Sequence, residues 1–241
     1  MARASRLLAV RASRIGAWLL QADPAKAMVK GGNVVVDNAH VSLRDVGRAW
    51  YLQPQHLPPD VDTGGLEVTA GYRADRDSGT FSYATHAAVV AVDPETGGVE
   101  ILDYVVVEDG GVLVNPMIVD GQVCGGTAQG IGTCLYEAMP FSPQGQPLAS
   151  TLMDYLLPSA TEVPRMRVLH METPSPYTEF GIKGLGEGGA VGPPAAIVSA
   201  VNDALRPLGV EVHDLPLTPA RILAAVKASP QTCCRKSSGD A

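Results

Sequence analysis

The chain has 241 residues, of which 46% are apolar and 18% are charged, and its net charge is −7. Its length suits one large domain or two small ones, and its apolar content excludes a disordered chain. The acidic balance argues against nucleic acid as the main partner, because phosphate binding requires clustered Lys and Arg. No apolar run approaches the roughly 20 residues that cross a bilayer, so we expect no membrane association.

The cysteines predict the redox setting. Cys124 and Cys134 lie in a Gly-rich apolar stretch, which predicts buried thiols. Cys233 and Cys234 are adjacent in a polar tail, a pattern that suits neither a disulfide framework nor a zinc site. We therefore expect a reduced, cytoplasmic environment.

The first twenty residues carry four arginines and no acid, and they superficially resemble a targeting leader. Arg11 and Arg14, however, interrupt the apolar run that a secretory leader needs. The apolar side chains recur at helical spacing and Asp23-Pro24 ends the run, which predicts an amphipathic helix. Its expected apolar stripe consists of Leu7, Leu8, Ile15, Trp18 and Leu19.

Short elements follow this helix. Gly31-Gly32 predicts a turn, and residues 34–36 predict a strand. Ser42 is expected to cap a second helix, because Asp45 follows three residues later in a variant of the capping box. Residues 53–65 contain three prolines and two glycines and predict a linker or loop.

A β-hairpin is the next strong signal. Residues 80–93 alternate with many β-branched side chains, residues 94–98 predict a turn, and residues 99–108 return. Asp109-Gly110-Gly111 ends the second strand, and Asn115-Pro116 predicts a helix start. Because strands and helices are interspersed around an antiparallel hairpin, we predict an α+β fold and no doubly wound parallel sheet.

Residues 116–139 predict a helix with five glycines. Each glycine inside a helix costs about 0.5–1 kcal/mol relative to alanine, so something must come close to this backbone. Further along, we expect a strand or short helix over residues 148–157, a strand over 165–173, a helix from Pro193-Pro194 to Leu205 with Pro194 in its first turn, a last helix over 219–227, and a disordered polar tail over 229–241.

The run Gly184-x-Gly186-x-x-Gly189 matches the glycine pattern of dinucleotide-binding loops. The surrounding sequence does not fit a dinucleotide-binding loop, because no buried strand precedes the run and Glu187 would repel a pyrophosphate. Glu187 itself allows two interpretations. At the mouth of a helix, in a partly buried loop, it could serve as a general base, whereas a surface loop residue would have no chemical role.

The glycine-rich run of residues 121–132 also has two readings. Glycines let a ligand touch the backbone, and Gln129 offers a donor and an acceptor to the edge of a heterocycle such as a pterin. Alternatively, small residues allow close packing of the helix against another element. Spacing alone does not separate the two.

Together these segments resemble the molybdenum hydroxylases, the family of xanthine dehydrogenase, aldehyde oxidase and carbon monoxide dehydrogenase, in the molybdopterin-binding large subunit. The first block of matching residues is Asp109-Gly110-Gly111, Asn115-Pro116, Gly121-Gln122, Gly125-Gly126, Gln129-Gly130-Ile131-Gly132 and Tyr136-Glu137. The second is Gly184-x-Gly186-Glu187 with the helix of residues 195–205. The resemblance extends from the first helix to about residue 226.

The resemblance implies a two-layer α/β sandwich of the molybdenum-cofactor-binding type. It implies that Glu187 lies beside the molybdenum and acts as general base on a Mo–OH group, whose oxygen derives from water, as an electron-poor carbon is oxidised. The pterin dithiolene would hold the metal, so no protein ligand to it is expected. The cofactor, either molybdopterin itself or its cytosine dinucleotide form, would contact Gln129, Gln122, Gly125, Gly126, Gly130 and Gly186.

The resemblance covers only about the carboxyl-terminal third of such a subunit. It implies residues 1–60 as part of an incomplete cofactor-binding lobe and residues 61–228 as the C-terminal molybdopterin-binding domain. A partner chain would supply the other lobe against an apolar face, and partner subunits would carry [2Fe-2S] clusters and FAD. The substrate would be an aldehyde, an N-heterocycle or a similar small molecule. The alternatives are a non-catalytic assembly or cofactor-delivery component, or an inactive truncated fragment.

Overall fold

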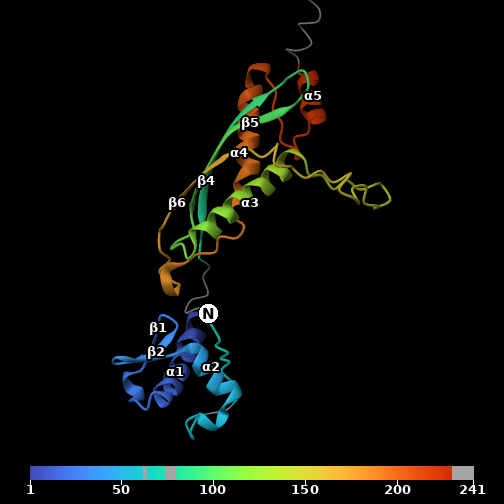
Figure 1. Ribbon diagram of the computed structural model, residues 1–241. Helices are drawn as coiled ribbons and strands as arrows, with labels where there is room; N and C mark the ends of the chain where they lie inside the picture. Colours follow the sequence, from blue (N-terminus) through green and yellow to red (C-terminus); the bar gives the residue numbers. More distant parts are fainter. Residues whose placement is uncertain (62–63, 74–79, 230–241) are drawn as a thin grey trace, which may run out of the picture. The chain divides into compact units, whose positions relative to one another are not determined.

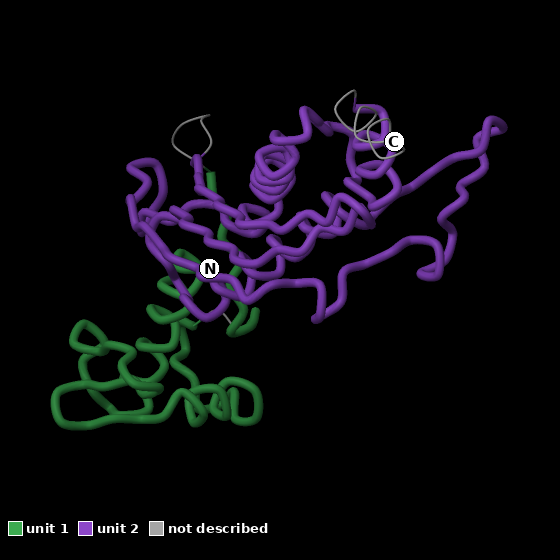
Figure 2. The backbone as a smooth tube through the Cα atoms, turned by 90° about the horizontal axis from the view of Figure 1, so that it is seen from above, with its two compact units in different colours: residues 1–73 green, residues 74–241 purple. Residues whose placement is uncertain are grey.

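A computed structural model describes residues 1–61, 64–73 and 80–229, which fall into two compact units, residues 1–73 and residues 74–241 (Figures 1 and 2). Each unit has its own apolar core. The functional division expected after residue 60 stays a prediction. Apart from Ser229, the predicted tail lies outside the described residues, as do Cys233 and Cys234.

Unit 1 packs two helices against a small antiparallel sheet. Its elements are α1 (Ala2–Leu19), β1 (Met28–Lys30), β2 (Asn33–Val36), β3 (Ala39–Ser42) and α2 (Leu43–Leu52). The predicted first helix, the turn at residues 31–32 and the following strand are confirmed. The capping box is also confirmed, because the Asp45 amide donates to Ser42 Oγ at 3.0 Å and the Ser42 hydroxyl donates to Asp45 Oδ2 at 2.6 Å.

The expected apolar stripe of α1 is only partly correct. Ile15 is buried, but the Trp18 side chain is 50% exposed and Leu7 is 54% exposed. Small residues take up much of the buried face instead. A Cβ atom on Gly16 would lie 2.5 Å from Cβ of Val34 on β2, so the helix can approach the sheet this closely only with glycine at that position.

Unit 2 is built on a three-stranded mixed sheet in the order β4 (Tyr83–Val92), β5 (Val99–Asp109) and β6 (Met166–Met171) (Figure 1). The predicted hairpin is confirmed, since β4 and β5 pair antiparallel. The predicted strand near residue 170 pairs parallel with β5, and this pairing places Glu108 beside His170. The segment over 148–157 contains only turns and bends, so the expected strand or helix there was wrong.

The described part of unit 2 also contains three α-helices: α3 (Pro116–Leu135), α4 (Gly188–Leu205) and α5 (Pro219–Ala228). Helices α3 and α4 pack against each other, and α4 also packs along β4, which gives the predicted two layers (Figure 1). The core between the layers contains Tyr104 and Val106 from the sheet, Val123 and Ile131 from α3, and Ile197 and Val201 from α4. The α+β prediction is confirmed.

Helix α4 begins five residues earlier than predicted, at Gly188, and both prolines lie inside it. A proline at position 193 leaves the carbonyl of Gly189 without its helical donor. The Thr127 hydroxyl on α3 donates to that carbonyl instead, at 3.3 Å. A residue on another helix therefore supplies the hydrogen bond that the interior of α4 lacks. Helix α3 is also shorter than predicted, because it ends at Leu135.

Candidate cofactor-binding site

The site begins with the turn Asp109-Gly110-Gly111 at the end of β5. A Cβ on Gly110 would lie 2.0 Å from Cδ1 of Leu185, and a Cβ on Gly111 would lie 2.4 Å from the carbonyl oxygen of Gly181. Gly111 also has a φ of 68°, which favours glycine. The two glycines thus let the segment that leads to Glu187 lie directly on this turn.

A buried ion pair fixes the same junction. Lys183 Nζ lies 3.0 Å from Asp109 Oδ1, and the two side chains are 7% and 1% exposed. Burial alone would raise the pKa of Asp109, but hydrogen bonds from Thr173, Gly111 and Lys183 outweigh it and hold this pKa well below its usual range. Lys183 also lies over the Tyr83 ring, 4.7 Å from its centroid. The start of the glycine loop is therefore anchored to both β4 and β5.

Glu187 stands at the mouth of α4, as its helix N-cap residue, and its side chain makes no capping hydrogen bond. The preceding residue is tied to α3, because Gln122 Nε2 donates to the carbonyl oxygen of Gly186 at 3.2 Å. Glu187 is exposed among the described residues. A role as general base would require partial burial by groups outside these residues.

Four of the five glycines of α3 fall into two groups, and the first packs against α4; the fifth, Gly132, lies against Glu137 and Pro158 instead. A Cβ on Gly126 would lie 3.0 Å from the amide nitrogen of Ala190, and a Cβ on Gly130 would lie 2.6 Å from Cγ of Pro193. On the facing helix, a Cβ on Gly189 would lie 2.4 Å from the carbonyl oxygen of Val123. For Gly126 and Gly130, close helix packing thus accounts for the glycine.

The second group faces open space. A Cβ on Gly121 or Gly125 would meet no atom within 4 Å. Gln122 and Gln129, two helical turns apart, are exposed on the same helix. The structure thus gathers Gly121, Gln122, Gly125 and Gln129 on one exposed stripe of α3, with Gln122 touching the loop of Glu187. We call these four residues the α3 stripe.

Sequence reasoning missed a buried polar group behind Glu187. The Glu108 side chain is 1% exposed, and neither carboxyl oxygen has a hydrogen-bond partner among the described residues. Burial raises the pKa of Glu108, while the charge of His170 opposes the shift. On β4, His86 Nδ1 lies 3.0 Å from the Tyr104 hydroxyl, and His86 Nε2 is buried without a partner. The alternation Tyr104, Val106, Glu108 along β5 could have revealed an inward-facing acid.

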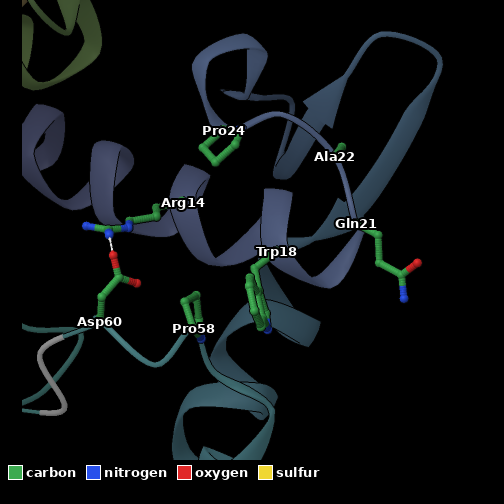
Figure 3. A pocket seen from close by; sticks show the side chains of 7 residues that line it. All are labelled: Arg14, Trp18, Gln21, Ala22, Pro24, Pro58 and Asp60. Carbon is green, nitrogen blue, oxygen red and sulfur yellow. Dashed lines mark ion pairs between the residues drawn. The ribbon is translucent and has the colours of Figure 1, made fainter.

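Each unit has a pocket. One of about 220 Å³ is lined by residues of β4, β5 and α4, among them His86, Glu108 and Gly188. Another, in unit 1, lies around Trp18, Pro24 and Pro58 beside the Arg14–Asp60 ion pair, and contains none of the predicted site residues (Figure 3).

The described part of the chain contains no cluster of three or more His, Cys, Asp or Glu side chains arranged to hold a metal ion. It also contains no helix with the length and apolarity needed to span a membrane. Both predicted thiols in this part are free: Cys134 is buried, which raises its pKa to about 12, whereas Cys124 is only half-buried.

Comparison with known proteins places the chain in a family. Residues 1–164 match the family model of the molybdopterin cofactor-binding domain. The chain is 36% identical over 228 residues to the nicotine 6-hydroxylase large subunit of Paenarthrobacter nicotinovorans, and 33% identical over 234 residues to the carbon monoxide dehydrogenase large chain of Hydrogenophaga pseudoflava. These alignments cover 93% and 94% of this chain but 28% of each relative.

The solved structures agree. Quinoline 2-oxidoreductase from Pseudomonas putida 86 matches with a TM-score of 0.75 and 38% identity, over 95% of this chain and 29% of that one. A carbon monoxide dehydrogenase matches with a TM-score of 0.72 and 27% identity. The chain therefore belongs to the molybdopterin cofactor-binding domain family and corresponds to part of a molybdenum hydroxylase large subunit.

Proposed function

We propose that this chain supplies one part of the active site of a molybdopterin-dependent hydroxylase, with Glu187 as its general base. The observation that carries the proposal is the hydrogen bond from Gln122 to Gly186, which joins the α3 stripe to the loop of Glu187. A candidate base and a candidate cofactor surface are thereby held together by one contact, although Gln122 and Glu187 are far apart in the sequence.

The α3 stripe has the chemistry to receive a pterin. At Gly121 and Gly125 a flat group could approach the helix backbone, because no atom lies within 4 Å of where a Cβ would be. The side-chain amides of Gln122 and Gln129 each offer a donor and an acceptor, as a heterocycle edge requires. We assign cofactor contact to Gln129, Gln122 and Gly125. Gly126 and Gly130 would act indirectly, by bringing α3 and α4 together, and Gly186 by holding the Glu187 loop.

Glu187 would accept a proton at its carboxylate from the oxygen that enters the substrate. When bound, the cofactor supplies the molybdenum redox chemistry that oxidises the substrate, with oxygen derived from water. Because Glu187 is exposed, another part of the complete enzyme would have to exclude water from it. The chain spans about 28% of the length of its relatives, so the rest of the site would come from outside these residues.

Exposed apolar surface supports the need for such a partner. On the strands, Val89, Leu169 and Met171 are each more than half exposed. The long segment between α3 and β6 extends away from the rest of unit 2 (Figure 1), and its side chains include Leu152, 75% exposed, and Met153, 87% exposed. Large exposed apolar patches often mark protein–protein interaction sites. We propose that the lobe missing from this chain covers this surface, while iron–sulfur and flavin subunits would carry electrons onward.

We propose the substrate class by analogy with the relatives. Their names specify nicotine, quinoline and carbon monoxide. Two of these three are N-heterocycles, and their proteins are the more similar to this chain, so we propose an N-heterocycle or an aldehyde of similar size. Either would present an electron-poor carbon for oxidation.

The proposal is tested by isolating the chain from its native host through an affinity tag and quantifying molybdenum, iron and flavin in the eluate. We expect a metal-loaded complex that contains a second cofactor-binding lobe and turns over N-heterocycles or aldehydes. A metal-loaded complex without turnover would favour an assembly or cofactor-delivery role. Recovery of the chain alone and metal-free would identify an inactive fragment and overturn the proposal.

A further inference from the structure

The buried carboxyl of Glu108 lies directly beneath the first residue of α4. A Cβ atom on Gly188 would stand 2.0 Å from Glu108 Oε1 and 2.9 Å from its carboxyl carbon. Gly188 follows Glu187 in the chain, so the backbone that presents the candidate base rests on this carboxyl. With any larger residue at position 188, the carboxyl of Glu108 would have to move.

A second contact of the same kind lies one turn further along α4. A Cβ on Gly192 would be 2.2 Å from Cδ2 of His86, so the helix backbone also rests on this imidazole ring. The two glycines, four residues apart, share one face of α4 and allow it to lie on two polar side chains of the sheet. The first turns of α4 therefore pack directly on Glu108 and His86.

The surroundings of Glu108 favour its neutral form. An ionised carboxylate with both oxygens buried and unpartnered would be costly. Two histidines face Glu108: His86 from β4 and His170 from β6. His86 contacts the Tyr104 hydroxyl of β5, and His170 Nε2 lies 2.7 Å from Asp120 of α3. Glu187 lies at the start of α4. Burial lowers the pKa of His86, which therefore offers no counter-charge at neutral pH. The charge of His170 favours the ionised form of Glu108, but burial outweighs it, so the pKa of Glu108 is raised.

We propose that Glu108 is a positioning residue for Glu187: its neutral carboxyl supports the first turn of α4 through Gly188, and loss of its proton displaces that turn. The ionised carboxylate would be stabilised by contact with water. The pocket of about 220 Å³ beside it, lined by Ser82, Ala84 and Val191 among others, is large enough to admit water. The consequence for catalysis rests on the proposed function, whereas the contact and its response to pH do not.

The full chain allows a direct test that does not depend on the cofactor. Amide signals of residues 186–189 and the Glu108 carboxyl carbon are followed by NMR as the pH is raised. We expect the amides to shift together with the carboxyl carbon, at a pH above the usual range of a glutamate. In Glu108→Gln, which keeps the size and neutrality of the acid, these amides should show no transition in that pH range.

Two control variants complete the experiment. Glu187→Gln removes the neighbouring carboxyl group and should keep the transition. Glu100→Gln, at an exposed position of the same strand, should also keep it. The proposal is overturned if the carboxyl of Glu108 titrates in the wild-type chain without movement of these amides, or if Glu108→Gln shows the wild-type transition. Turnover is not measured, so failure here would leave the assignment of Glu187 as base untouched.

Discussion

The amide of Gln122 and the carbonyl of Gly186 are 3.2 Å apart, and this bond joins the middle of α3 to the residue before Glu187. The bond lies at an exposed position, so its net contribution to stability is modest while its effect on geometry is local. Both partners belong to motifs that the sequence had marked, but nothing in their spacing predicted that they would touch.

Removal of this contact should loosen the loop and leave the fold intact. We expect Gln122→Ala to lower the free energy of unfolding by only about 0.5–1.5 kcal/mol. Amide hydrogen exchange at residues 186–188 should become faster. Gln129→Ala is the matched control, since its side chain has no hydrogen bond among those described, and it should change neither quantity. Equal exchange rates in Gln122→Ala and the wild-type chain would show that the bond does not hold the loop.

The two groups of α3 glycines should respond to alanine in opposite directions. Gly130→Ala places a methyl group 2.6 Å from Pro193 and should destabilise the chain by about 1–3 kcal/mol. Gly125→Ala meets no neighbour, so it should stabilise the helix by about 0.5–1 kcal/mol. Urea unfolding of the two variants measures both values. If Gly130→Ala were as stable as Gly125→Ala, the packing role would be wrong.

The gain from Gly125→Ala should have a cost in cofactor binding. A methyl group on the α3 stripe would occupy the space that we assign to the pterin, so the purified complex should contain less molybdenum. Gln129→Ala should lower the molybdenum content too, through the loss of a hydrogen-bonding side chain. If the molybdenum content per mole of chain were unchanged in both variants, the cofactor would not bind at this face of α3.

The anchor at Lys183 should contribute far more to stability than a surface ion pair. Lys183→Met leaves the buried carboxylate of Asp109 without its counter-charge, and we expect a loss of about 3–5 kcal/mol. Arg167→Met is the control, because it breaks an exposed pair with Asp103 that should contribute about 0–1 kcal/mol. Denaturant midpoints of both variants give the comparison, and similar losses would contradict the buried anchor.

Local chemistry made part of this fold predictable. The hairpin and the cap at Ser42 follow from turn residues and from side chains three positions apart, and both were confirmed. The start of α4 was misplaced because Thr127, far away in the chain, satisfies the carbonyl that a proline leaves free. Gly125 and Gly126 are adjacent and identical in type, so only the packed structure separates an open position from a contact. Glu108 was overlooked because its meaning depends on α4 lying above it.

Stability should depend on the protonation of Glu108 with a definite sign. Its pKa is raised on folding by burial, so its contribution is fully present below the pKa of the unfolded chain and is lost as pH rises through the folded value. The wild-type chain should therefore become less stable relative to Glu108→Gln between mildly acidic and neutral pH. Urea unfolding across this range, with Glu100→Gln as control, checks the trend. A constant difference between wild type and Glu108→Gln would show that Glu108 has the same protonation in the folded and unfolded chains.

The base assignment makes the strictest prediction for the assembled enzyme. Glu187→Gln preserves the size of the side chain at an exposed position, so folding and molybdenum content should be unchanged. Turnover should be abolished, because the amide cannot accept the proton that leaves the attacking oxygen. Glu211→Gln, on an exposed segment after α4, should retain full activity. If Glu187→Gln also retained it, the acceptor of that proton would have to be sought in the part of the enzyme that this chain does not contain.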